Sequence, residues 1–402
     1  MPAISWTAPP ALPPTHYIDN RIYTDPALFE LERRYIFGAG WKLLCHESEI
    51  ARPGDYTTTR LAGVGLAVLR DRDGRVRCFF NVCPHRGATL LRRPAGSLAG
   101  DRIQCFYHLW SFDSTGRCTT IPRAEGYAAC GLSPEDVHLR EVRTETLFGW
   151  VFVTLDDAAE PLHGFLGPAL AELEEVFGAA DVEVFHLHRA EFRANWKLFV
   201  ETNCEGYHEL LHVLNRTTGH GQKGYAERRW RTHPRGHNTF EQATIGYDRL
   251  ALGGRGEHLF PGMKPNGHVV IDLFPDVMFN VRATVGRVDT LTPLAPGLTL
   301  LECRGIGLKG DSEAVRAQRI AQHNQVWGPS GRNLPEDLWA IETQWANIAS
   351  GALPYSVIAR EEGNRAMDDA PVRNFYAEWR RRVGRASHDI DAPASVVDGA
   401  AA

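Results

Sequence analysis

The chain has 402 residues and a formal net charge of −5, with 44 Lys and Arg residues against 49 Asp and Glu residues. The basic residues are dispersed, which excludes a basic surface for nucleic acid or an anionic membrane and indicates small-molecule chemistry. A chain of this length exceeds what one hydrophobic core usually supports, so we expect two domains.

Residues 1–39 are predicted to form an N-terminal arm followed by a short helix. Four prolines between residues 9 and 14 favour extended backbone. In the stretch DPALFELERRYIF, Asp25 is the expected N-cap and Pro26 the first helical residue. The segment lacks the basic and apolar regions of a secretory signal, and no later run is long and apolar enough to span a bilayer, so we expect a cytoplasmic protein.

Residues 40–156 are predicted to form a small all-β domain. Short alternating runs such as DYTTTRL, GLAVLRD and VRCFFNV are separated by turn signals such as Asp73-Gly74. The pattern predicts an antiparallel β structure.

Residues 157–385 are predicted to form a second domain of the α+β class. A run of strands at 268–308 is flanked by helical patterns at 165–177, 198–214, 311–327 and 336–350. This arrangement predicts an antiparallel sheet with helices packed on it. The small and polar residues 386–402 are expected to be a disordered tail.

Two loops of the β domain carry a candidate metal site. Cys83-Pro84-His85 and Cys105-Phe106-Tyr107-His108 each offer one thiolate and one imidazole. Two such loops can hold a two-iron cluster with both cysteines on one iron and both histidines on the other. A structural zinc site uses the same residue types, but zinc loops usually separate their ligands by two or more residues, whereas one proline separates Cys83 from His85.

These loops resemble the C-x-H … C-x-x-H signature of Rieske [2Fe–2S] domains, and Trp110 of the second loop also matches. The chain departs from the family pattern at Phe106 and Leu109, where a proline and a glycine are usual. The departure puts the geometry of the loop in question, not its ligands. The resemblance implies a Rieske-type cluster held by Cys83, His85, Cys105 and His108.

A second candidate metal site lies at His208 and His212. The two histidines are four residues apart, a spacing that places two imidazoles on one face of a helix. Such pairs also occur on ordinary helices. Two histidines and one carboxylate on one side of an iron leave positions open for O₂ and substrate, as in non-haem Fe(II) oxygenases.

The stretch from Asn195 to His212 resembles the N-W-K … E-N-x-x-E-x-Y-H-x-x-x-x-H pattern of Rieske non-haem iron oxygenases, with Thr202 where asparagine is common. The resemblance covers most of the chain and is greatest to large (α) subunits of the aromatic-ring-hydroxylating type. It implies a catalytic domain of the helix-grip type with a mononuclear Fe(II) bound by His208, His212 and one carboxylate.

Two acids compete for the place of that carboxylate. The family carries it on a helix after a GPxG turn, and the match by position in this chain falls on Asp337, with Glu336 as the rival. Leu338 and Ile341 follow at helical spacing, which favours Asp337 on the buried side. An ordinary helix N-terminus also carries acids.

Glu205 lies where the family carries an acid that joins the two metal centres. The resemblance implies that Glu205 accepts hydrogen bonds from a cluster histidine of one subunit and an iron-binding histidine of another, and that three chains form a ring. A solvated acid in the first turn of a helix is the alternative.

The resemblance implies a terminal oxygenase that uses electrons from a separate reductase, with or without a ferredoxin, to activate O₂ and hydroxylate an aromatic substrate. A small β subunit is a possible further partner. The chain has no G-x-G-x-x-G motif, so we expect neither NAD nor flavin. Two alternatives stay open: a monooxygenase acting on an N-methyl or quaternary ammonium compound held by aromatic rings, and a Rieske electron-transfer protein without the second iron.

Overall fold

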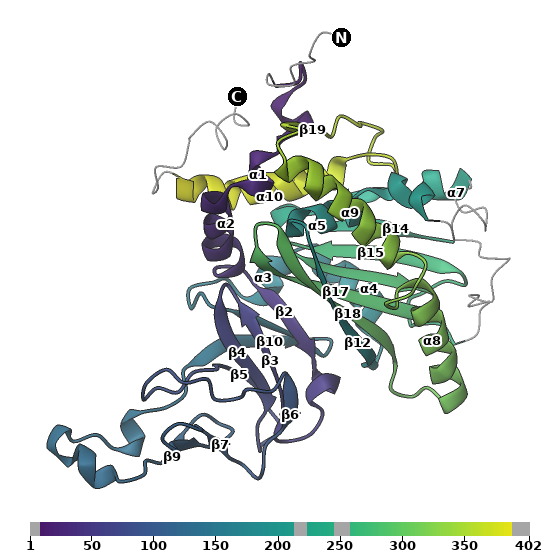
Figure 1. Ribbon diagram of the computed structural model, residues 1–402. Helices are drawn as coiled ribbons and strands as arrows, with labels where there is room; N and C mark the ends of the chain where they lie inside the picture. The colour runs from purple at the N-terminus through teal and green to yellow at the C-terminus, as the bar shows by residue number, and fades with distance from the viewer. Residues whose placement is uncertain (1–8, 213–222, 245–257, 388–402) are drawn as a thin grey trace. The chain divides into compact units, whose positions relative to one another are not determined.

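The computed structural model describes residues 9–212, 223–244 and 258–387, and the chain divides into two compact units (Figure 1). One unit runs from Phe37 to Leu162, and the other joins the residues up to Ile36 with those from His163 onward. None of the helices in these described ranges is long and apolar enough to cross a bilayer. Of the tail expected at 386–402, the residues after Ser387 lie outside the described residues.

The first unit is an all-β structure, as the sequence predicts. Its larger sheet is antiparallel and has the strand order β2-β11-β10-β5-β4-β3-β6. The strands are β2 (Lys42–His46), β3 (Asp55–Leu61), β4 (Val64–Arg70), β5 (Val76–Phe80), β6 (Ala95–Ser97), β10 (Glu141–Leu147) and β11 (Trp150–Thr154). A smaller sheet consists of β7 (Ile103–Gln104), β8 (Ser111–Phe112) and β9 (Cys118–Thr120), and short 3-10 helices are η3 (Glu47–Ile50), η4 (Ala124–Cys130) and η5 (Pro134–Asp136).

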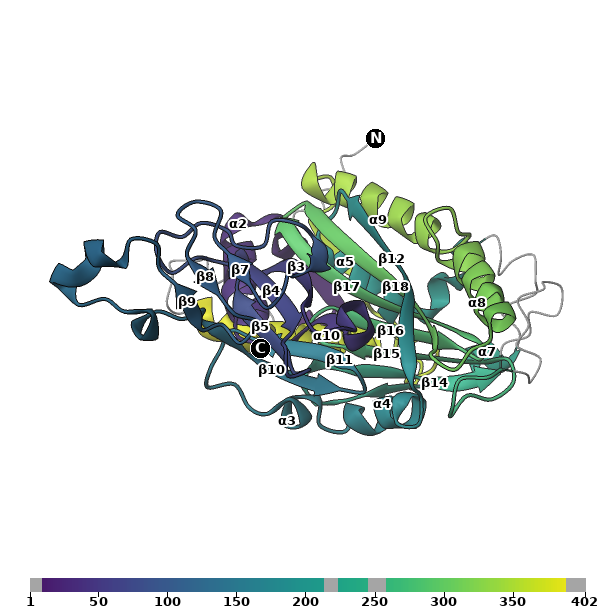
Figure 2. The same ribbon diagram turned by 90° about the horizontal axis from the view of Figure 1, so that it is seen from below.

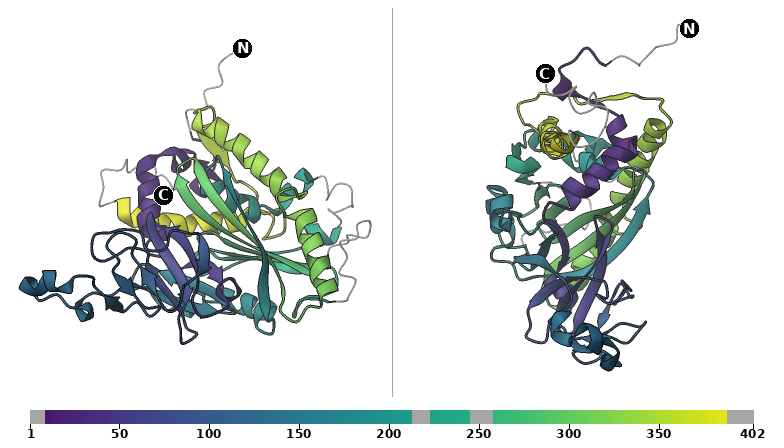
Figure 3. Two further views of the ribbon diagram at one scale, coloured as in Figure 1. Left: turned by 60° about the horizontal axis from the view of Figure 1, so that its bottom comes forward. Right: turned by 90° about the vertical axis from the view of Figure 1, so that its left-hand side faces the viewer.

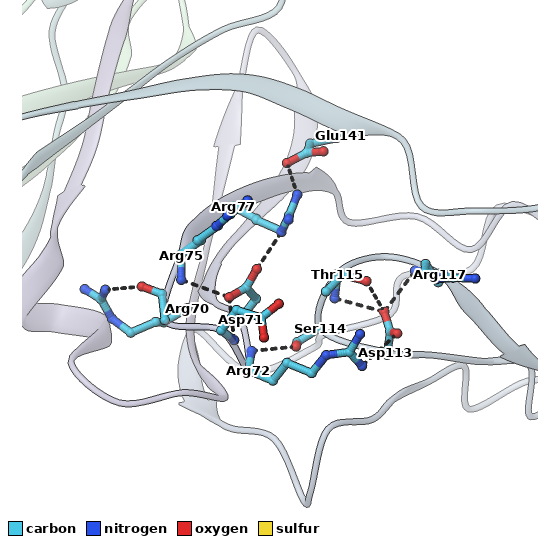
Figure 4. Close-up of polar contacts among 12 residues, drawn as sticks. Arg70, Asp71, Arg72, Arg75, Arg77, Asp113, Ser114, Thr115, Arg117 and Glu141 are labelled. Atoms are coloured by element: carbon cyan, nitrogen blue, oxygen red, sulfur yellow. Dashed lines mark hydrogen bonds and ion pairs between the residues drawn. The ribbon is translucent and has the colours of Figure 1, made fainter.

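Two aspartates close matching turns in this unit (Figure 4). The carboxylates of Asp71 and Asp113 each accept hydrogen bonds from the backbone N–H groups two and four residues ahead, at 2.9 to 3.1 Å. The third residue ahead is a glycine in each turn, Gly74 and Gly116, with φ of 82° and 85°, a conformation that favours glycine. The guanidinium of Arg72 lies 3.1 Å from Asp113, which ties the β8–β9 turn of the small sheet to the larger sheet.

The second unit contains a seven-stranded antiparallel sheet in the order β12-β18-β17-β16-β15-β14-β13. The strands are β12 (Val182–Phe192), β13 (Trp230–Thr232), β14 (Asn238–Thr244), β15 (Gly267–Leu273), β16 (Val277–Arg282), β17 (Val285–Ala295) and β18 (Leu298–Leu308). A two-stranded sheet pairs β1 (Tyr17–Asp19) with β19 (Tyr355–Val357). The α+β class predicted for this part of the chain is confirmed.

Helices cover both faces of the larger sheet. In Figure 2, α8 (Glu313–Val326) and α9 (Leu334–Ala349) follow one face, and α4 (Ala169–Phe177) lies on the other. The helix α10 (Ala370–Ser387) contacts both α2 (Pro26–Glu32) and α5 (Trp196–Cys204). Figure 3 shows α10, in yellow, from two sides. Shorter elements are α1 (Arg21–Thr24), η2 (Arg33–Phe37), α3 (Leu162–Leu166), η6 (Gly206–Leu211), α7 (Lys223–Ala226) and η7 (Pro234–Gly236).

The N-terminal helix begins as the sequence predicts, and a buried ion pair fixes its other end. The side chain of Asp25 accepts a hydrogen bond from the N–H of Ala27 at 2.7 Å. At the end of α2, the carboxylate of Glu32 lies 2.5 Å from Nζ of Lys197, and the indole N–H groups of Trp196 and Trp379 donate to it at 2.8 and 2.7 Å. Glu32 therefore joins α2, α5 and α10.

We predict that Glu32→Gln destabilises the second unit by about 3 kcal/mol, because the ammonium of Lys197 would be buried without a charged partner. Urea unfolding followed by tryptophan fluorescence measures this loss. Glu30→Gln is the matched control, since Glu30 is exposed and pairs with Arg33 at the surface; it should cost less than about 1 kcal/mol. Equal losses in the two variants would contradict the role assigned to the buried pair.

Candidate functional site

The two cysteine–histidine loops of the all-β unit share one backbone geometry. In each loop the carbonyl of the cysteine accepts a hydrogen bond from the N–H four residues later, at 2.9 Å from Gly87 and 3.1 Å from Leu109. Gly87 and Leu109 have φ of 77° and 61°. A leucine thus occupies a left-handed position where a glycine is relaxed, and the departure noted at residue 109 carries backbone strain.

These loops bring the four predicted cluster ligands together. Cys83 and Cys105 are buried free thiols that contact each other. The rings of His85 and His108 lie 4.7 Å apart and are partly exposed. Nε2 of His85 is 3.1 Å from the hydroxyl of Tyr127. Two buried thiols and two outward imidazoles fit the ligand set of a Rieske cluster.

His208, His212 and Asp337 converge in the second unit. Nε2 of His208 and Nε2 of His212 lie 3.5 and 3.4 Å from Oδ1 of Asp337. These separations are long for hydrogen bonds but match neighbouring ligand atoms that are each about 2.1 Å from one ion. Oδ1 of Asp337 is buried and has no hydrogen-bond partner among the described residues. The three side chains therefore fit an iron held by two imidazoles and one carboxylate.

The second nitrogen of each ring has its own partner. Nδ1 of His208 lies 2.5 Å from the backbone carbonyl oxygen of Glu205, and Nδ1 of His212 lies 2.9 Å from Oε2 of Glu336. A metal-bound imidazole commonly donates its other N–H to such an oxygen, which fixes the orientation of the ring. The two acids that compete in the sequence thus stand in different places, because Asp337 faces both Nε2 atoms and Glu336 faces the far side of His212.

The prediction that His208 and His212 share one face of an α-helix is wrong. The helix α5 ends at Cys204, His208 lies in the 3-10 helix η6, and His212 follows the end of η6. Gly206 is the first residue of η6. Its backbone passes very close to another segment, and a Cβ there would lie 2.6 Å from the carbonyl oxygen of Ala366, so a glycine is required. The break in the helix turns both rings toward Asp337, with ring centroids 5.2 Å apart.

A cavity of about 580 Å³, including its open mouth, adjoins this site. Part of its lining is one row of directly paired residues across β14 to β17, and residues paired in this way share one face of the sheet. The row consists of Phe240, Val270, Asn280 and Arg287. Sequence reasoning did not find these residues, because strand alternation shows which residues share a face but not what lies over that face.

Arg287 is the fixed cation of the cavity. The residue is only 3% exposed, its Nε forms an ion pair with Asp289 at 2.8 Å, and its Nη2 donates to Oδ1 of Asn203 at 3.2 Å. Within the described part of the chain, Nη1 has no hydrogen-bond or ion-pair partner. The guanidinium is therefore held in one orientation with donor capacity to spare.

Aromatic rings form another part of the lining, and each of them already faces a cation of the chain. Guanidinium carbons lie 3.6 to 5.4 Å from the ring centroids. The pairs are Phe240 and Tyr225 with Arg228, and Trp327 with Arg282 and Arg287.

Two acids also line the cavity. Burial raises the pKa of Glu205 to about 7, and burial raises the pKa of Glu209 to about 7 as well. The backbone of Glu205 holds His208 in place.

Comparison with known proteins matches both units to described families. The Rieske [2Fe-2S] domain family matches residues 40–135, and the family described as ring hydroxylating alpha subunit (catalytic domain) matches residues 179–385. The α subunit of 2-aminobenzenesulfonate 2,3-dioxygenase from Alcaligenes sp. is 41% identical, over 96% of this chain and 99% of the relative. The hydroxylase α subunit of methanesulfonate monooxygenase from Methylosulfonomonas methylovora is 38% identical, over 96% of each chain.

Solved structures share the fold at lower identity. Naphthalene 1,2-dioxygenase from Rhodococcus sp. aligns with a TM-score of 0.81 and 21% identity, over 91% of this chain and 94% of that one. The quaternary ammonium Rieske monooxygenase CntA with L-carnitine aligns with a TM-score of 0.74 and 23% identity, over 91% and 96%. The fold expected from the sequence is confirmed.

We predict that Asp337→Ala and Glu336→Gln affect iron differently. Anaerobically purified protein should contain about three irons and two acid-labile sulfides per chain, and Asp337→Ala should lower the iron to about two without loss of sulfide. Glu336→Gln should keep the third iron but bind it about 10- to 100-fold more weakly, because only the orientation of His212 is disturbed. Loss of the third iron from Glu336→Gln but not from Asp337→Ala would reverse the two roles.

Proposed function

Because this chain belongs to the ring-hydroxylating α subunits of the Rieske oxygenases, we propose that it hydroxylates an aromatic sulfonate. It is a Rieske-type oxygenase with a [2Fe–2S] cluster and a mononuclear iron. A bare electron carrier with a structural second domain, one of the alternatives left open by the sequence, is thereby excluded. Enzymes of this family take electrons from a reductase, with or without a ferredoxin, and form multimers.

In this proposal each centre is held by the residues that the sequence indicated. Cys83, His85, Cys105 and His108 would hold the cluster, and His208, His212 and Asp337 would hold the iron. When bound, the cluster supplies electrons and the iron activates O₂. The carboxylate of Glu336 keeps the Nδ1 proton of His212 in place, so that Nε2 presents its lone pair toward Asp337.

The observation that carries the substrate assignment is the buried guanidinium of Arg287. A guanidinium presents N–H donors in a plane that matches the oxygens of an oxyanion, and fixing it in advance lowers the entropy lost on binding. A sulfonate at Nη1 would be held beside the iron site. The two relatives named above act on sulfonates, one of them aromatic. Trp327 and Phe240 contribute apolar atoms to the lining of the cavity, which suits an aromatic substrate.

The alternative of a quaternary ammonium substrate has less support. A cage for such a cation needs free aromatic faces, whereas Trp327, Tyr225 and Phe240 each face an arginine of the chain itself. Arg287 would also repel a cation. The structural similarity to CntA is below 25% identity and speaks only for the fold.

The proposal includes partners for this chain. We assign Glu205 as the link between the iron site of one subunit and the cluster of the next in a ring of three chains. The second cluster loop exposes Phe106, Tyr107 and Leu109, which are 53%, 57% and 50% exposed, and this surface suits contact with a neighbouring subunit. A β subunit is a further partner, since the relatives named above are α subunits.

The substrate proposal predicts which compound is oxidised in a single turnover. Chemically reduced protein mixed with O₂ should convert 2-aminobenzenesulfonate to a hydroxylated product, quantified per chain by mass spectrometry, without need of the natural reductase. Methanesulfonate and L-carnitine serve as competitors of different class. Oxidation of methanesulfonate in preference would overturn the aromatic assignment, and oxidation of L-carnitine would overturn the anionic one.

Arg287→Gln should raise the half-saturating concentration of the arylsulfonate about 10- to 100-fold, because a hydrogen bond to a charged group is worth about 1.5–3 kcal/mol. Aniline, an uncharged analogue, provides the comparison, because its half-saturating concentration should not change when the guanidinium is lost. Arg287→Lys keeps the charge, so its half-saturating concentration of the arylsulfonate should lie between those of the wild type and Arg287→Gln. An equal change for aniline and the sulfonate would show that Arg287 acts only on the packing of the cavity.

Glu205→Gln should leave iron and sulfide contents unchanged and lower product formation with a reductase about 10- to 100-fold, since an amide cannot accept an N–H bond at both ends. Stopped-flow spectroscopy of cluster oxidation locates the defect. Unchanged oxidation of the cluster by O₂ and substrate in this variant would refute the link.

A further inference from the structure

Three histidines outside the iron site converge on one point of the second unit. His186 and His188 lie two residues apart on β12 and therefore on one face of the strand, and His323 reaches them from α8. One ring nitrogen from each lies within 4.8 Å of the other two. The ring centroids of His186 and His323 are 5.2 Å apart. We propose that His186, His188 and His323 bind a second metal ion, a divalent transition-metal ion of which Zn²⁺ is the representative.

The backbone around these rings makes room for them. Gly305 on β18 pairs with His186, and a Cβ at residue 305 would lie 2.9 Å from Nδ1 of His323. Any other residue at 305 would push the ring of His323 away. A register shift between Val184 and His186 also interrupts the β12–β18 ladder at this point, and such bulges re-aim side chains next to functional sites.

Four of the six nitrogens of these rings are buried without a hydrogen-bond partner in the described structure. Nε2 of His186, Nδ1 of His188 and both nitrogens of His323 are buried, and no described residue offers any of them a hydrogen bond. A neutral imidazole carries one N–H donor and one lone pair, and burying either without a partner costs free energy. The ring of His323 is fully buried. One cation at the centre would engage one lone pair from each of the three rings.

The chemistry of the site favours a particular class of ion. Neutral imidazole binds zinc, copper, nickel and iron, whereas calcium and magnesium prefer oxygen ligands. Three histidines with an open fourth position are a known zinc ligand set. The charge of Arg287, which pairs with Gly305 across β17 and β18, is compensated by Asp289 at 2.8 Å.

The proposed ion is separate from the iron site, but both lie along one row of directly paired residues of the sheet. Asn280, Arg287, Gly305 and His186 are directly paired across β16, β17, β18 and β12. The row therefore runs from the cavity to the three histidines. The ion would tie the edge strand β12 to the last turn of α8, which is followed at once by Trp327 of the cavity. It would fix that wall of the cavity without contacting the substrate.

Zinc itself is the probe for the test. The full chain carrying His208→Ala and His212→Ala removes the imidazoles of the iron site, and an assay of two sulfides per chain shows that the cluster occupies its cysteines. After incubation with Zn²⁺ and desalting, this protein should retain about one zinc per chain by mass spectrometry. Zinc should also raise its thermal unfolding temperature.

Adding His186→Asn and His188→Asn should abolish both the retained zinc and the thermal shift. The matched control is His163→Asn, a substitution of an exposed histidine on α3 of the same unit, which should keep both. His188→Asn alone should weaken zinc binding at least tenfold, and it serves if the double substitution does not fold. Retention of zinc by His188→Asn with unchanged affinity, or no zinc in the parent protein, would overturn the proposal.

Discussion

Oδ1 of Asp337, a buried carboxylate oxygen without a hydrogen-bond partner among the described residues, is the constraint around which the second unit is arranged. An ionised oxygen in that position costs several kcal/mol unless a cation lies beside it. The Nε2 atoms of His208 and His212 lie 3.5 and 3.4 Å from this oxygen, too far for good hydrogen bonds. One shared ion would engage all three groups. The end of α5 at Cys204, the glycine at 206 and the first turn of α9 all follow from bringing these atoms together.

The seven-stranded sheet next to the iron site is more rigid than the short helix η6. Directly paired side chains form a continuous row on one face of the sheet, and the position of each is fixed by the register of two neighbouring strands. Arg287 stands in the middle of the row, bound to Asp289 on its own strand and to Asn203 of α5. It therefore couples the sheet to the helix that leads into the iron site. A substrate group held by Arg287 is positioned by the whole sheet.

The sequence predicted those parts of the site whose residues are close together in the chain. The ligand spacing is visible in the sequence for the two cysteine–histidine loops and for the pair His208 and His212. A resemblance to a known family extends over both. Helical periodicity favoured Asp337 over Glu336, but it could not show that Glu336 contacts the other side of His212, because both acids stand in the first turn of α9. The glycine at the start of η6 is required by a close approach to Ala366, a contact far away in the sequence.

The histidines of the further site illustrate the same limit. The pair His186 and His188 is visible as alternation on a strand, but its third member lies on a helix beyond the whole sheet, and only the glycine at 305 lets that ring approach. Charge in the cavity is equally a property of the folded chain. Burial in the folded chain raises the pKa values of Glu205 and Glu209 to about 7. The preference for an anionic substrate group comes from Arg287, whose guanidinium is held by Asp289 and Asn203.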